Sequence, residues 1–326
     1  MKRRSSICWV GGAVALCALA AAGCKPDLGA PQSLVSGPRI LAVRGMPPDA
    51  TPGTDMVNYD ILAVDVGGTV SSPVVNWAQC LEPDPPAFGN DVSDACLDIP
   101  DDTTAPAPTF SAIPDINDCS VFGPDTPPPK KGQPPTRAAD PDTTGGYYQP
   151  VRARWDSDAG PVLAFALERI ICHLANAPVT EAGEFASTYT PNKNPVLAGL
   201  TLDPAGAALP LYTAGQAAPP APATLPPGAG VLLEADFSAD SAETFPVWDV
   251  VSLTLIQQRE SLRVSWFATG GIFEHDTTGR TSDETETFTQ NVWTAPTTPG
   301  PVFFWAVLRD SRGGIDFAAA EIDVTP

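Results

Sequence analysis

The chain has 326 residues, with 18 basic against 38 acidic side chains and a formal net charge of −20. An acidic surface repels phosphate backbones, which excludes nucleic acid as a partner. Hydrophobic residues make up 43% of the chain, enough for a sizeable core, whereas 17% are charged and 38 are prolines. This balance is typical of strands joined by irregular loops and not of helical bundles.

The first 23 residues have the pattern of a secretion signal. Lys2, Arg3 and Arg4 form a positive segment, residues 7–22 carry no charge, and small residues lead up to Cys24. The apolar run is shorter than the roughly 20 residues that a membrane-spanning helix needs. An ordinary signal peptide has no requirement for a cysteine at its end, and a plain secretory signal with a chance cysteine is the alternative interpretation.

The order Ala21-Ala22-Gly23-Cys24 resembles the lipobox of bacterial lipoproteins, although Ala21 stands where that pattern prefers Leu. The resemblance implies that the signal peptide 1–23 is removed and that Cys24 carries the lipid. Lys25 follows in place of the Asp that would retain the protein at the inner membrane, which implies the outer membrane. Several acyl chains, each contributing roughly 0.8 kcal/mol per CH2, would anchor the protein firmly.

Removal of the signal leaves 15 basic against 38 acidic side chains, a net charge of −23. Two of the seven cysteines leave with it, and Cys24 is used for the lipid. The remaining four are Cys80, Cys96, Cys119 and Cys172. Four thiols in an exported chain indicate two disulfides. Zinc is the competing interpretation, but no CxxC or paired histidine spacing supports it.

Residues 24–37 are predicted to be a short flexible tether. Behind it, 38–191 and 192–326 repeat each other weakly, with five short matches in the same order. The longest match joins Gly160–Arg169 to Gly300–Arg309. The first copy alone could be a helix, but the second is rich in Phe, Trp and Val between a Gly-Pro start and a polar exit. We therefore predict a buried strand in both places.

Strands separated by Pro/Gly-rich turns, with a tryptophan on a central strand, resemble bacterial immunoglobulin-like domains. Val264–Phe267, Val292–Pro296, Gly300–Arg309 and Gly314–Val324 match strands C, E, F and G of that family. The resemblance implies an all-β chain of two immunoglobulin-like β-sandwich domains. Such sandwiches bury tryptophans between their sheets. The tryptophans expected in the cores are Trp77, Trp155, Trp266, Trp293 and Trp305.

The first domain carries a predicted insertion, 81–150, which is rich in Pro, Asp and Thr and poor in core residues. Disulfides can hold such a segment. If the strand of Trp77 lies antiparallel beside Val162–Arg169, Cys80 and Cys172 leave at opposite ends, roughly 20 Å apart and beyond disulfide reach. Of the two connectivities that remain, Cys80–Cys96 with Cys119–Cys172 is the simpler.

No catalytic motif appears, and we expect no catalytic residue, no metal and no cofactor. The two histidines, His173 and His275, lie at a strand exit and in a polar turn, and a serine triad through either is a distant alternative. Acidic side chains in loops of the second domain could hold calcium, although none fits a known calcium pattern. They are Asp236, Asp240, Asp276, Asp283, Glu284 and Glu286.

Trp248 has no counterpart in the first repeat. It is expected in the core on an extra strand; the alternative is an exposed aromatic that stacks on a ligand, as in carbohydrate-binding modules. The sequence therefore predicts a non-enzymatic lipoprotein of the outer membrane, on its periplasmic face or at the cell surface. Its expected role is a structural or protein-interaction module with an envelope partner. The alternatives are a polysaccharide-binding accessory lipoprotein and, more distantly, a hydrolase.

Overall fold

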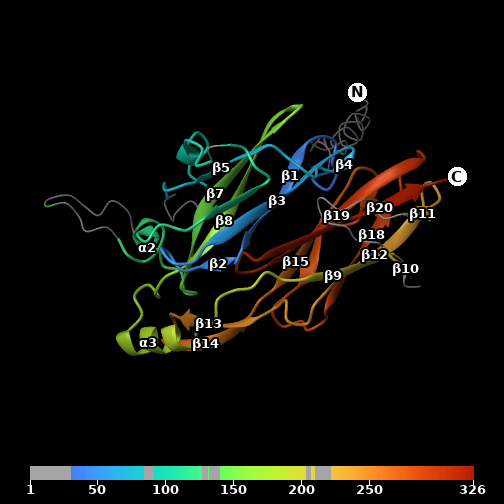
Figure 1. The fold of residues 1–326 in the computed structure, drawn as a ribbon. Coiled ribbons are helices and arrows are strands. Elements are labelled where there is room, and N and C mark those ends of the chain that lie inside the picture. Colours follow the sequence, from blue (N-terminus) through green and yellow to red (C-terminus); the bar gives the residue numbers. More distant parts are fainter. Residues whose placement is uncertain are drawn as a thin grey trace, which may run out of the picture. The chain divides into compact units, whose positions relative to one another are not determined.

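The computed structural model describes residues 31–83, 92–103, 105–126, 131, 140–202, 207–209 and 222–326. Gln32–Pro326 forms one compact unit. In the described part, helix is confined to the 3-10 turn η2 (Asp94–Cys96), α2 (Asp118–Val121) and α3 (Val179–Thr188), and every other regular element is a strand (Figure 1). None of the helices among these residues is long and apolar enough to cross a membrane.

The first half of the chain supplies one sandwich. Its strands are β1 (Arg39–Met46), β2 (Asp49–Ala50), β3 (Val57–Asp65), β4 (Gly68–Thr69), β5 (Val75–Gln79), β6 (Thr109–Ala112), β7 (Gly146–Ser157) and β8 (Gly160–Ile171). One sheet joins β1, β3 and β4, with β6 also paired to β3, and the other has the order β2-β8-β7-β5. The inward-facing residues of both sheets make one core, in which Trp77 stacks on Phe110 with ring centroids 5.8 Å apart.

The second half supplies the other sandwich. Its strands are β9 (Leu197–Leu202), β10 (Ala207–Ala208), β11 (Ala223–Leu225), β12 (Gly230–Phe237), β13 (Thr244–Asp249), β14 (Thr254–Arg259), β15 (Leu262–Ala268), β16 (Ile272–Phe273), β17 (Thr277–Arg280), β18 (Phe288–Thr294), β19 (Gly300–Asp310) and β20 (Ile315–Val324). The sheets β10-β9-β12-β18-β16 and β11-β20-β19-β15-β17 enclose a core that contains Trp266, Trp293 and Phe304. The strands β13 and β14 form a separate hairpin.

The two sandwiches have the same strand topology. The first strand pairs with the next long strand (β1 with β3, β9 with β12). Between these two strands in sequence, a short strand pairs in parallel with the last strand of the sandwich (β2 with β8, β11 with β20). In the facing sheet, three strands are neighbours in the same order in each sandwich, β5-β7-β8 and β15-β19-β20. This is the immunoglobulin-like arrangement, and the predicted all-β fold class is confirmed.

The common topology corrects the alignment of the repeats. Gly160–Arg169 and Gly300–Arg309 are both strands, as predicted, but β8 is the last strand of its sheet and corresponds to β20, not to β19. The strand that corresponds to β19 is β7, which the sequence interpretation had partly assigned to the insertion 81–150. That segment also contains β6, which pairs with β3. The predicted insertion therefore contributes one strand and part of another to the first sandwich.

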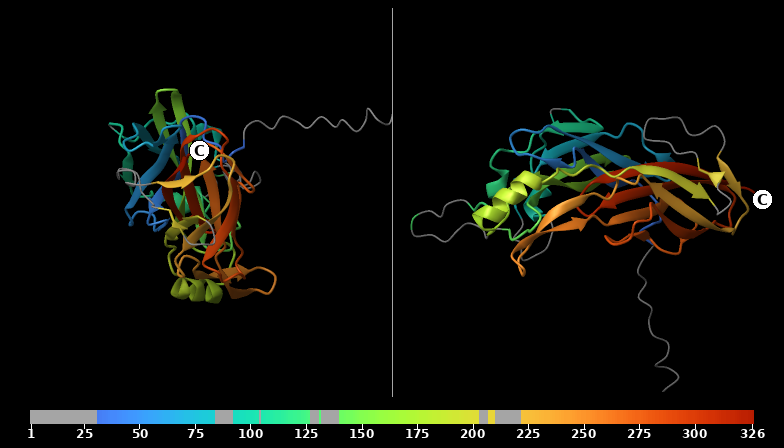
Figure 2. Two further views of the ribbon diagram at one scale, coloured as in Figure 1. Left: turned by 90° about the vertical axis from the view of Figure 1, so that its right-hand side faces the viewer. Right: turned by 90° about the horizontal axis from the view of Figure 1, so that it is seen from below.

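The tryptophans expected in the cores are all buried, but one of them has a different place. Trp305 packs with Leu62, Val64 and Val307 in a separate layer between the two sandwiches, and its indole N–H donates to Thr69 Oγ1 at 2.8 Å. This layer joins the outer face of β1 and β3 to the outer face of β19 and β20. The ribbons in Figure 2 show these strands of the two sandwiches, in blue and red, next to one another. A continuous apolar layer of this kind makes the two sandwiches pack as one body.

Candidate functional site: the junction between the sandwiches

The predicted lipid-bearing residue, Cys24, lies outside the described residues. The end of the predicted tether, in contrast, is ordered against the second sandwich. Ser33 and Val35 are buried, the Val35 N–H donates to the Ala268 carbonyl at 2.8 Å, and the Ala268 N–H donates to the Ser33 carbonyl at 2.9 Å. Any flexible tether therefore ends before residue 33, which corrects the predicted boundary at residue 37.

The structure pairs Cys80 with Cys96 and Cys119 with Cys172, the simpler of the two connectivities. Cys80 and Cys172 do not leave at opposite ends, as predicted, because β5 lies beside β7 and parallel to β8, so both cysteines leave their strands at the same end. The Cys80 N–H bonds to Pro150, which pairs with Leu167. Cys172 lies five residues further along β8, roughly 16 Å away at a strand rise of about 3.3 Å, so the pair is still out of reach.

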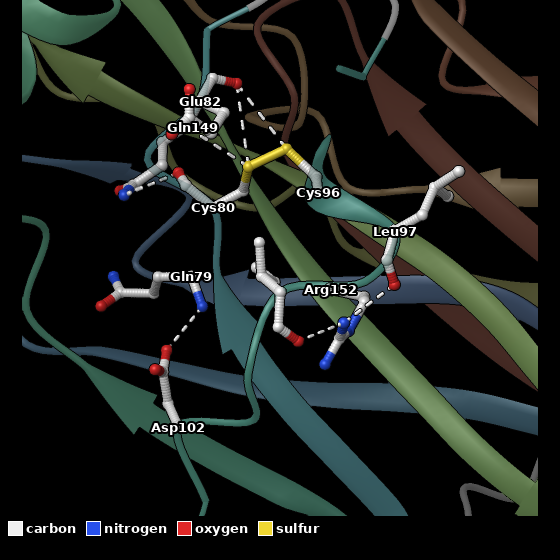
Figure 3. The surroundings of a disulfide bond; sticks show 9 residues. Gln79, Cys80, Glu82, Cys96, Leu97, Asp102, Gln149 and Arg152 are labelled. Carbon is white, nitrogen blue, oxygen red and sulfur yellow. Dashed lines mark hydrogen bonds between the residues drawn. A yellow bond between two sulfur atoms is a disulfide. The ribbon is translucent and has the colours of Figure 1, made fainter. Parts of the chain in front are cut away.

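The Cys80–Cys96 disulfide holds a loop against the edge strand of the first sandwich (Figure 3). Arg152 on β7 lies under this loop with its side chain 2% exposed, and it donates to the carbonyls of Leu97 and Ile99 at 2.9 and 2.8 Å. Further along the loop, the Asp102 N–H donates to the Trp77 carbonyl at 2.7 Å. The loop therefore covers the outer edge of β5, which would otherwise be open to pairing with another chain.

A buried ionic cluster connects the end of the first sandwich to the start of the second. Arg169 on β8 is fully buried and ion-paired with Asp49 at 2.9 Å, and Tyr189 bonds to both side chains. The same Asp49 oxygen accepts the N–H of Asn192 at 3.0 Å, while the Asn192 amide donates to Asp310 at 3.2 Å. Residue 192 is thus bound to both sandwiches.

A second buried cluster continues this contact in the second sandwich. The Arg312 side chain, 2% exposed, donates to Glu260 Oε1 at 2.5 Å, to Glu243 Oε2 at 2.9 Å and to the Thr190 carbonyl at 3.1 Å. Burial raises the pKa of Glu260 to about 7, and the neighbouring Asp310 adds to the rise. An Arg held by two carboxylates and a linker carbonyl fixes the linker to the second sandwich.

Two further contacts complete the junction. Asn194 donates to the Gly45 carbonyl at 2.8 Å and accepts the Ile315 N–H at 2.7 Å, so the linker bridges β1 and β20. Arg44 on β1 is paired with Asp60 of its own sheet and with Asp316 of the second sandwich, both at 2.7 Å. The linker is therefore hydrogen-bonded to both sandwiches and lacks the contact-poor character of a hinge.

The histidines give no support to catalysis. The Nδ1 of His173 lies 2.9 Å from the Leu174 carbonyl, and its Nε2 lies 2.7 Å from Asp125 Oδ1. The Leu174 carbonyl, followed by Asp125, raises the pKa of this ring. With both nitrogens engaged, the ring has none left to accept a proton from a nucleophile. His275 is exposed in its turn and donates its backbone N–H to Asn291 at 3.2 Å.

In the part of the chain that the structure describes, no three His, Cys, Asp or Glu side chains lie close enough together to hold a metal ion. The acidic side chains that were expected in loops of the second domain accordingly form no calcium cluster there, and one of them, Asp236, lies on β12 and not in a loop. Asp240, Asp283 and Glu284 accept hydrogen bonds that lower the pKa of each. Two of them share the Thr281 hydroxyl, at 2.6 Å from Asp283 and 2.9 Å from Glu284.

Trp248 lies in a small core, as expected. It is 4% exposed on β13 and packs with Leu174 and Phe185, which places the hairpin β13–β14 against α3 (Figure 1). A tryptophan in this position has no free face for stacking on a sugar. The feature on which the polysaccharide-binding alternative depended is therefore contradicted.

No family model matches the chain, and no curated protein matches it. Among solved structures it is similar to the D00-D0 domain of intimin (11% identity, 89% of this chain and 99% of that chain covered, TM-score 0.23). It is also similar to fibronectin(III)-like modules of Clostridium thermocellum CbhA (12%, 90% and 92%, 0.19) and to the Yersinia pseudotuberculosis adhesin InvE (10%, 91% and 62%, 0.22). At such scores the similarities carry no argument, and the fold assignment rests on the strand topology above.

Proposed function

We propose that this protein is a non-catalytic, lipid-anchored module of the bacterial outer membrane that presents two immunoglobulin-like sandwiches as one rigid interaction unit. The observation that supports rigidity is the linker, whose residues 189–192 are bonded to Asp49 of the first sandwich and Arg312 of the second, and whose Asn194 is bonded to the Gly45 carbonyl. A rigid double domain keeps its loops and edges in a fixed arrangement, so a partner can bind without first ordering them.

The anchor part of the proposal rests on the sequence of residues 21–24 and on the charge of the mature chain. With a net charge of −23, the folded part is repelled by anionic lipid headgroups, so an acyl group at Cys24 would be the element that holds it to a membrane. An envelope protein is the partner class that fits best, because the described residues offer neither a catalytic group nor an exposed tryptophan platform.

The anchor is tested by Cys24→Ala in a bacterium with two membranes, with fractionation and labelling by a palmitate analogue. We expect the wild-type protein in the outer-membrane fraction with label, and the variant without label and absent from the outer-membrane fraction. Cys17→Ala is the matched control, since that cysteine lies within the predicted signal peptide, and it should leave both readouts unchanged. If Cys24→Ala still incorporates the palmitate label, the lipid assignment is wrong.

A further inference from the structure

A cleft of about 420 Å³ lies where the first sandwich meets the second. One wall consists of consecutive residues of two strands, Ile40–Val43 of β1 and Ala164–Glu168 of β8. Consecutive residues line a cleft only where it runs along the edge of a strand, because side chains of alternate residues point to opposite faces. The other wall is formed by the second sandwich, with Arg263, Arg309 and Ile315.

Both strand edges in the cleft have unused pairing capacity. β1 pairs with β3 on one side only, and β8 pairs with β7 along its whole length. On its other side β8 pairs only with β2, at Arg169 and Ile170. Over Gly160–Glu168, therefore, no strand in the described part of the chain is hydrogen-bonded to the outer edge of β8, although β1 lies close beside it. Unpaired N–H and C=O groups along such an edge can bind an added extended chain.

Two arginines in the cleft differ from the other arginines of the junction. Arg44, Arg169 and Arg312 each lie within 2.9 Å of a carboxylate. Arg263 and Arg309 face each other directly across β15 and β19, and among the described residues neither forms an ion pair. The bond found for Arg309 is to the Leu41 carbonyl, at 2.9 Å. Such an unneutralised pair stands out in a chain with 38 acidic side chains.

The surroundings of the two arginines favour an added negative charge. Burial, and then the charge of Arg263, lower the pKa of Arg309 to about 10. Burial, and then Asp49, raise the pKa of Glu168 well above its usual range, which disfavours a negative charge on this side chain. The one other carboxylate, Asp310, already accepts the N–H groups of Arg312 and Gly314, both at 2.8 Å.

We propose that this cleft binds an extended peptide with a carboxylate, which adds to the outer edge of β8 and places its carboxylate on Arg263 and Arg309. Strand addition supplies backbone hydrogen bonds, and the arginine pair selects for Asp, Glu or a chain terminus. The apolar lining from Ile40, Leu41 and Ile315 favours apolar side chains beside that carboxylate. This inference deepens the proposed role as an interaction module.

The test uses the full mature chain with Cys24→Ser, so that it does not depend on the lipid. A random octapeptide library displayed on phage is selected on this protein. One enriched peptide is then synthesised in two versions, one with its carboxylate and one in which that carboxylate is replaced by the corresponding amide. We expect an acidic residue to be enriched, the acidic peptide to bind at least tenfold more tightly than its amide version, and amide NMR shifts to move in Leu163–Glu168.

The variants decide the role of the arginine pair. Arg263→Gln should remove the preference for the acidic peptide, whereas Arg154→Gln, an arginine on β7 outside the cleft, should keep it. Selection without acidic residues, shifts that avoid β8, or an unchanged preference in Arg263→Gln would each overturn the proposal. If acetate alone displaces the acidic peptide as well as free peptide does, and the β8 amide shifts do not move, the cleft is a site for small anions. This result would also overturn the proposal. Membrane release of the Cys24→Ala protein is a separate result that bears only on the anchor.

Discussion

The buried Arg312 gives the most demanding prediction about the junction. Its guanidinium, 2% exposed, is the cation that faces Glu260, a carboxylate with no exposed surface, at 2.5 Å. Removing one partner of a buried ion pair leaves an uncompensated charge and costs about 3–5 kcal/mol. Arg312→Met keeps much of the side-chain volume and removes the charge. We therefore expect it to lower the free energy of unfolding by about 3–5 kcal/mol at pH 7, measured by urea denaturation followed through tryptophan fluorescence.

A second substitution separates the charge effect from a packing effect. Glu243 is the other carboxylate bound to Arg312. When Arg312 is replaced, Glu243 is still paired with Lys193 Nζ at 3.1 Å, so Glu260 is the carboxylate that loses its cation. Adding Glu260→Leu to Arg312→Met should therefore restore most of the lost stability, since a buried pair can be replaced by apolar groups at little cost. Two results would refute this reasoning: a loss below about 1 kcal/mol in the single variant, or a double variant that is no more stable than the single one.

The pH dependence of the single variant follows from the same carboxylate. Burial has already raised the pKa of Glu260 to about 7 with Arg312 present, and removal of that cation raises it further. A carboxyl group whose pKa is higher in the folded than in the unfolded state destabilises the fold as the pH rises above its unfolded value, near 4.5. The cost of Arg312→Met should accordingly be smaller at pH 5 than at pH 7.

Two more predictions concern the first sandwich. Replacing both cysteines of Cys80–Cys96, which closes a loop of 16 residues, with Ser should lower the free energy of unfolding by about 3 kcal/mol. The same change at Cys119–Cys172, which closes 53 residues, should lower it by about 4 kcal/mol. The reverse order in urea denaturation would contradict the explanation by loop entropy. Glu168→Gln should stabilise the protein increasingly as the pH rises above 4.5, because the native side chain resists ionisation and loses up to about 1.4 kcal/mol per pH unit until its raised folded pKa is reached. The exposed Glu274→Gln is its control, and equal pH profiles of the two variants would contradict the burial argument.

The strands were the part of the fold that the sequence predicted well. The apolar segments that became β15, β19 and β20 lie between turn residues, and local pattern suffices for them. The neighbour of β5 was assigned wrongly because β7 contains Pro150, Arg152 and Arg154, which mimic a loop. The short β6 was missed for the same reason, since four residues with two polar ones give little periodic signal.

The junction could not have been predicted from local pattern. Arg169 and Arg312 look like surface residues in sequence, and their burial depends on partners far away in the chain: Asp49 is 120 residues from Arg169, and Glu260 is 52 from Arg312. Thr190-Pro191 was interpreted as the end of a domain, whereas the Thr190 carbonyl accepts a hydrogen bond from Arg312. Burial of a charge is decided by such tertiary pairing, which a single sequence does not display.

The claim on which the account depends is that the two sandwiches form one rigid body. Spin labels introduced as noncanonical amino acids at Asp158 and Glu286, exposed positions on the two sandwiches, leave the disulfides intact. A pair at Asp158 and Val66, both on the first sandwich, is the rigid reference. Double electron–electron resonance should give a single distance distribution for the pair between the sandwiches that is as narrow as the reference. A broad or multiple distribution would show a mobile linker and contradict the account.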